Sequence, residues 1–171
     1  MTTETPRRAE FIMPGNILKT KLGSGGLDEA ILEQAQKLID ESGIDFLPAA
    51  QRFLVALQEG IRLSAAHDGR FDDEALIATM LYPAMQLKGN GGMFGYPMIT
   101  AVGTRLVKFL ETIRTPDDDA LDIVGGFATA LQAIMLLGEK AAEIEEHGQD
   151  LTEALDDACA RYFEKYTPEE A

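Results

Sequence analysis

The stretch DEALIATMLYPAMQLKGNGGMFG, residues 73–95, decides the fold of this chain. Its apolar residues recur at intervals of three and four, and this period predicts an α-helix with one face in a core. The residues predicted to face inward are Ile77, Met80, Leu81, Ala84 and Leu87. The same period places Ala78, Tyr82, Met85, Gly89 and Gly92 on the opposite side. Because this outer stripe is apolar or small, we expect it to be a contact surface.

The helical period continues on both sides of this stretch. It predicts one helix near residues 27–41, another from Asp45 to about His67, a fourth across Ile99–Ile113 and a fifth from Thr115. Thr115 is predicted to cap the fifth helix, and close helix contact is expected to offset the cost of Gly125 and Gly126 within it. We therefore predict three segments: an extended arm at 1–26, a helical domain at 27–145 and a tail at 146–171.

The predicted tail is an acidic helix at the end of the chain. Asp150 and Glu153 have the spacing of a capping box, so the tail helix is expected to start there. The predicted fold is accordingly all-α, with a bundle of antiparallel helices, an additional N-terminal helix and this C-terminal tail.

The composition restricts the classes of partner. The 171 residues fit one domain with extensions. With 15 basic and 29 acidic residues the formal charge is −14, which opposes binding to nucleic acid or to an anionic membrane. Cys159 is the single cysteine, so an intrachain disulfide is excluded, and we expect a cytoplasmic protein. We find no metal-binding or cofactor-binding motif and expect none of these ligands.

The segment AMQLKGNGGMFG, residues 84–95, resembles the signature of histidine-containing phosphotransfer domains. That family's pattern is Ala-His-x-Leu-Lys-Gly, followed by a further glycine six positions after the first. Leu87, Lys88, Gly89 and Gly95 are in register with it. Met85 stands where the family has its phosphoacceptor histidine. The resemblance extends over about residues 45–140 and implies an antiparallel four-helix bundle of the phosphotransfer type.

The substitution at position 85 excludes the family's chemistry at that position. In the family, the imidazole takes a phosphoryl group from the aspartyl phosphate of a receiver domain, and a thioether cannot form the corresponding phosphoramidate. We interpret His67 and His147 as ordinary solvated residues. Without the phosphoacceptor, the function that the resemblance still implies is docking of a partner. The predicted partner-binding residues are Tyr82, Met85, Gln86, Lys88, Gly89 and Gly92.

The leading hypothesis is a pseudo-phosphotransfer protein, a module without enzymatic activity that binds a response-regulator receiver or a histidine kinase. A second hypothesis is a phosphatase of receiver domains, in which Gln86 or Asn90 orients water. A third is a helical protein that forms a homodimer through the exposed stripe. A purely structural interpretation also exists: Met85 would fill the core, the glycines would end the helix, and Pro83 would rotate the faces by a residue.

Overall fold

The computed structural model describes residues 28–67, 69, 71–138 and 141–166, and in these ranges the only regular structure is helical. The α-helices are α2 (Glu29–Glu41), α3 (Leu47–Ala65), α4 (Asp73–Gly91), α5 (Pro97–Thr112), α6 (Asp118–Leu137) and α7 (Ala141–Tyr166), with a 3-10 helix η1 (Gly92–Phe94) after α4. The predicted arm at 1–26 and the side chain of His147 lie outside the described residues. The chain divides into two compact units, residues 1–38 and 39–171, and each is described by itself.

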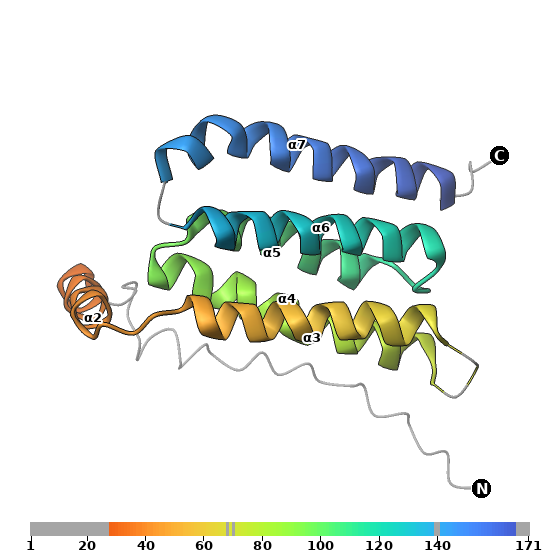
Figure 1. Cartoon of the computed structure of the whole chain (residues 1–171), viewed down its shortest axis with the longest axis horizontal. Helices are drawn as coiled ribbons and strands as arrows, with labels where there is room; N and C mark the ends of the chain where they lie inside the picture. Colours follow the sequence, from red (N-terminus) through yellow and green to blue (C-terminus); the bar gives the residue numbers. More distant parts are fainter. Residues whose placement is uncertain (1–27, 68, 70, 139–140, 167–171) are drawn as a thin grey trace, which may run out of the picture. The chain divides into compact units, whose positions relative to one another are not determined.

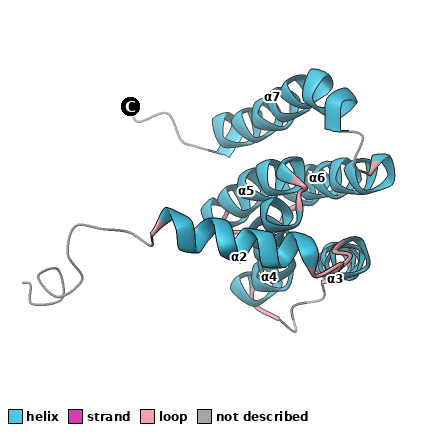
Figure 2. Ribbon diagram, turned by 90° about the vertical axis from the view of Figure 1, so that its left-hand side faces the viewer, coloured by secondary structure: helices cyan, strands magenta, loops and turns pink. Residues whose placement is uncertain are grey.

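Within the larger unit, the helices from α3 to α7 alternate in direction (Figure 1). Helix α4 contacts α3 and α5, helix α6 also contacts α3 and α5, and α7 contacts α5 and α6. Figures 1 and 2 show the resulting layers, with α3 and α4 on one side, α5 and α6 in the middle and α7 outermost. The all-α prediction is confirmed for the described residues.

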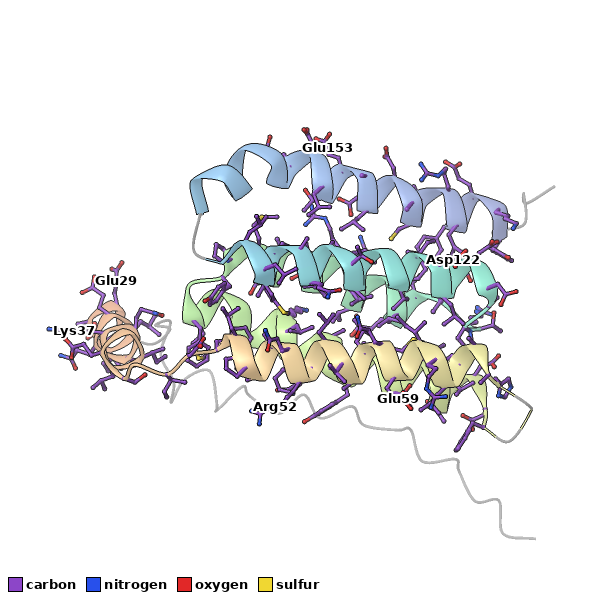
Figure 3. All side chains as sticks on the ribbon, in the orientation of Figure 1. Glu29, Lys37, Arg52, Glu59, Asp122 and Glu153 are labelled. Atoms are coloured by element: carbon purple, nitrogen blue, oxygen red, sulfur yellow. The ribbon has the colours of Figure 1, made fainter. Side chains whose placement is uncertain are left out.

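The core of this unit forms from one apolar face of each helix, as the sequence period requires. Its largest fully buried side chains include Phe109, Phe127, Leu57, Met80, Leu87, Leu106 and Leu131. Charged residues point outward: Figure 3 shows Arg52 and Glu59 on the outer side of α3, and Glu153 on the outer side of α7. Burying these apolar faces contributes the main favourable free energy of folding.

Two aspartates start two of the helices. The Asp72 Oδ1 atom accepts a hydrogen bond from the Ala75 N–H at 2.7 Å, and the Asp117 Oδ1 atom accepts one from the Ala120 N–H at 2.9 Å. Each carboxylate satisfies a backbone donor that has no partner within the helix, and its charge suits the positive end of the helix dipole. The prediction that Thr115 caps α6 was therefore wrong, because Asp117 occupies that position.

Helix α7 differs most from its prediction. It begins at Ala141, well before Asp150, and it runs for 26 residues. Gly148 lies within it and is buried. A Cβ atom added there would lie 3.0 Å from the Met98 Sδ atom. Gly148 is thus a point of close packing inside α7, although it lies just before the predicted start of the tail helix. Leu155 and Tyr162 are buried, so this helix is part of the packed unit.

The glycines of α6 also depart from expectation. A Cβ atom added at Gly125 or Gly126 would meet nothing within 4 Å. Close helix contact therefore does not offset the propensity cost at these two positions, and that prediction was wrong.

Helix α2 agrees with the predicted range, except that Leu27 lies outside the described residues. Its apolar residues Ile31, Ala35 and Leu38, whose spacing of three and four predicts the helix, are all exposed. The sequence also predicts that this helix packs across the bundle, and that packing stays a prediction.

Helix α6 is long and apolar enough to span a membrane by length and composition. Half of that stretch is buried inside the protein, which is the pattern of a core helix.

Candidate functional site

The candidate site is the outward face of α4 with the first residue of η1, which we call the α4 strip: Tyr82, Met85, Lys88, Gly89 and Gly92. All five residues are exposed, and Tyr82 and Met85 retain 64% and 51% of their accessible surface. The predicted inner residues Ile77, Met80, Ala84 and Leu87 are buried, and Leu81 is half-buried. The faces of α4 therefore lie as the period predicts, and Met85 does not fill the core.

Pro83 leaves this arrangement intact. It is a buried residue inside α4, on the core side of the helix. The absence of a backbone N–H at a proline removes one helical hydrogen bond, but the residues after it keep the predicted faces. The rotation by one residue considered from the sequence does not occur.

Gln86 and Asn90 lie at the edge of the strip and are both half-buried. The Asn90 Nδ2 atom donates a hydrogen bond to the Gln86 backbone oxygen at 2.7 Å. This bond ties the Asn90 amide to its own helix, one turn back. The bond takes up one of the two N–H donors of the Asn90 amide, so it does not by itself prevent this side chain from orienting water at a partner's phosphate.

Gly89 is the most open position of the strip. A Cβ atom there would meet nothing within 4 Å, and the backbone dihedral φ is not positive. Neither the packing nor the backbone conformation therefore requires glycine at position 89. What glycine does provide is an unobstructed backbone surface one turn from Met85, which lets another molecule approach closely.

A different glycine ends η1, the 3-10 helix that follows α4 directly. Gly95 has φ of +82°, its N–H donates to the Gly92 oxygen at 3.3 Å, and the Tyr96 N–H donates to the Gly91 oxygen at 2.8 Å. This is the Schellman pattern, in which a left-handed residue ends a helix. The structural interpretation therefore accounts for Gly95, whereas it does not account for Gly89.

Helix α5 packs against the backbone of the strip residues Lys88 and Gly92. A Cβ atom at Gly103 would lie 3.0 Å from both the Lys88 N and the Lys88 Cα atoms. Thr100, one turn earlier on α5, donates from its hydroxyl to the Lys88 backbone oxygen at 2.9 Å and accepts from the Gly92 N–H at 2.7 Å. Sequence reasoning missed both residues, because their partners belong to another helix.

Polar contacts anchor the end of α7 to the start of α6. The Tyr162 hydroxyl donates to the Asp117 Oδ2 atom at 2.9 Å, and the Tyr166 hydroxyl donates to the Asp119 Oδ2 atom at 2.9 Å. Lys165 forms an ion pair with the same Asp119 oxygen. Hydrogen bonds from Lys165 and Tyr166 lower the pKa of Asp119. Burial is the main cause that raises the pKa of Tyr162, and the hydrogen bond to Asp117 is the second.

Grooves run along α7. The first has a volume of about 520 Å³ and is lined by residues of α5 and α7 that include Lys108, Phe109 and Phe163. A second, of about 310 Å³, lies between α6 and α7, where Asp122 and Arg161 line it. A third, of about 630 Å³, lies where α5 and α7 end, and its lining includes Arg114 and Tyr166. Cys159 borders the first groove, and burial with the nearby Asp156 raises its pKa to about 11, so its thiol is a poor nucleophile at neutral pH.

Among the described residues, no group of three or more His, Cys, Asp or Glu side chains is placed to hold a metal ion. His67 is exposed just after the end of α3, whereas the strip lies on α4.

Comparison with known proteins adds no relative: no family model matches the chain, and no curated protein or solved structure is significantly similar to it.

Proposed function

We propose that this chain is a pseudo-phosphotransfer protein, which binds a receiver domain or a histidine kinase through the α4 strip and does not carry phosphate. The proposal includes the finer fold, in which α3, α4, α5 and α6 are an antiparallel four-helix bundle of the phosphotransfer type. The ring of contacts from α3 to α4, α5, α6 and back to α3 supports this fold.

The observation that carries the proposal is the exposure of Met85 in the middle of the strip. A solvated helix face normally carries charged and polar groups, whereas Tyr82 and Met85 expose large apolar side chains here. Met85 is at the position that resembles the family's phosphoacceptor. A thioether there can contact a partner's apolar surface and cannot accept a phosphoryl group.

Lys88 supplies the electrostatic part of the proposed contact. It is exposed beside Met85 and Gly89, in a chain whose formal charge is −14. A receiver's phosphorylation site is acidic, so a lysine beside the apolar centre gives local charge complementarity. Because this charge is exposed, its contribution falls as ionic strength rises.

The proposal is tested by mixing the chain with receiver domains from the same genome, each phosphorylated with labelled phosphate. We expect one receiver to co-elute with the chain in size-exclusion chromatography. The label should stay on the receiver, because position 85 is methionine, and the phosphate lifetime should not change with a substoichiometric amount of the chain.

Each alternative has its own signature in this experiment. Acid-labile label on the chain would show phosphotransfer to a histidine. An accelerated loss of phosphate at substoichiometric amounts would show a phosphatase. Self-association without any receiver complex would favour the homodimer. Phosphotransfer or phosphatase activity would overturn the proposal outright, and self-association would overturn it once the histidine kinases of the same genome, mixed with the chain in the same way, also fail to co-elute.

A further inference from the structure

The last turn of α4 is hydrogen-bonded to a side chain of another helix. Lys88 and Gly92 are four residues apart, so their C=O and N–H groups are a pair that an uninterrupted α-helix joins directly. The Thr100 hydroxyl bonds to both: it accepts from the Gly92 N–H at 2.7 Å and donates to the Lys88 oxygen at 2.9 Å. We call this arrangement the Thr100 bridge.

Close packing on both sides fixes where the Thr100 hydroxyl lies. A Cβ atom at Gly91 would come within 2.9 Å of the Thr100 N and Oγ1 atoms, and one at Gly103 would come within 3.0 Å of the Lys88 backbone. The two helices therefore touch through their backbones at both ends of the bridge. Threonine is also β-branched, which restricts its side-chain rotation.

The bridge joins the two residues that delimit the most open part of the α4 strip. Lys88 and Gly92 are its hydrogen-bonded ends, and Gly89 lies between them. Fixing this turn in the free protein means that a partner does not pay to order it on binding. The bridge thereby raises the affinity of the strip for a partner, although Thr100 itself is half-buried and lies on α5.

We propose that Thr100 is a positioning residue for partner binding, which holds Lys88, Gly89 and Gly92 in their docking geometry through its hydroxyl. This inference rests on the proposed function, because it assumes that the α4 strip is the docking surface.

The test compares three substitutions in the full chain. Thr100→Val removes the hydroxyl and keeps the side-chain shape, whereas Thr100→Ser keeps the hydroxyl. Thr112→Val is the matched control, because the Thr112 hydroxyl on the same helix donates only to the Lys108 oxygen of its own helix, at 2.7 Å. For each variant, amide hydrogen exchange at Gly92 is followed by NMR, and the dissociation constant for the co-eluting receiver is measured.

For Thr100→Val we expect exchange at Gly92 to become about tenfold faster, as loss of one protecting hydrogen bond implies. We expect the dissociation constant to rise about fivefold or more at a temperature where thermal denaturation shows the variant to be fully folded. Thr100→Ser should restore both exchange and affinity to within about twofold of wild type, and Thr112→Val should change neither.

The contrary outcomes separate two failures. If Thr100→Val accelerates exchange at Gly92 but binds the receiver as wild type does, the bridge is purely structural and the positioning role is wrong. Unchanged exchange would mean that the bridge does not close the turn, which also overturns the inference. If the wild type binds no receiver while its Gly92 exchange depends on Thr100, then the proposed function itself fails, and the docking role fails with it.

Discussion

At the scale of single residues, two glycines in helices of this protein have opposite surroundings. Gly89 faces open space, whereas Gly103 lies against the Lys88 backbone of the neighbouring helix. Both lie inside α-helices, so both carry the same intrinsic cost relative to alanine. A single sequence shows that both are glycines, but it cannot show which of them faces another helix. For the same reason Gly125 and Gly126 were wrongly predicted to be close helix contacts.

This contrast predicts opposite effects of the same substitution. Gly103→Ala should lower the free energy of unfolding by about 1–3 kcal/mol, because the new Cβ atom would force α4 and α5 apart. Gly89→Ala should raise it by up to about 1 kcal/mol through improved helix propensity. Urea denaturation of the two variants measures both changes. Equal shifts in the two variants would contradict the packing of α5 on Lys88.

At the scale of elements, apolar faces could be predicted from the sequence, and polar partners could not. Val124, Phe127 and Leu131 of α6 are buried, and their spacing of three and four residues predicts this, because such residues share one face of a helix. The capping residue of α6 was missed because several residues near its start, among them Thr115 and Asp117, are good caps. The start of α7 was missed because a glycine and capping-type residues within a helix look like a boundary.

The anchoring of α7 at Asp119 predicts a pH dependence. The pKa of Asp119 is lowered in the folded protein, so its contribution to stability is present above its unfolded value and is lost as pH falls through the lower folded value. The loss therefore lies below about pH 4. The difference in unfolding free energy between wild type and Asp119→Asn should be constant near neutral pH and vanish in this acidic range.

Asp122→Asn is the control for this measurement, since it removes a like charge one turn further along α6. Denaturation midpoints collected from pH 2 to pH 7 give the comparison. If Asp122→Asn reproduced the pH profile of Asp119→Asn, the effect would come from net charge rather than from the contacts with Lys165 and Tyr166.

At the scale of the whole chain, the all-α class and the faces of α4 followed from periodicity alone, because burying one side of a helix imposes a 3.6-residue repeat. The exposed α4 strip was predictable for the same reason. What supports the strip was not predictable: the Thr100 bridge and the approach of Gly103 depend on which helices are neighbours. Periodicity likewise does not identify the partner, because recognition depends on the surface of the protein. The proposed class of partner rests on the resemblance around Met85.

Binding to the α4 strip is the central claim, and Gly89 gives the most direct measurement of it. The receiver that co-elutes with the chain is titrated by calorimetry into the wild type, Gly89→Ala and Gly89→Arg. The Cβ atom of either side chain would meet nothing within 4 Å, and Gly89 is exposed, so neither substitution should unfold the protein. We predict that Gly89→Ala binds within about threefold of wild type, while the bulk of Gly89→Arg weakens binding at least about tenfold, or 1.4 kcal/mol. Wild-type affinity in Gly89→Arg would contradict docking at the α4 strip.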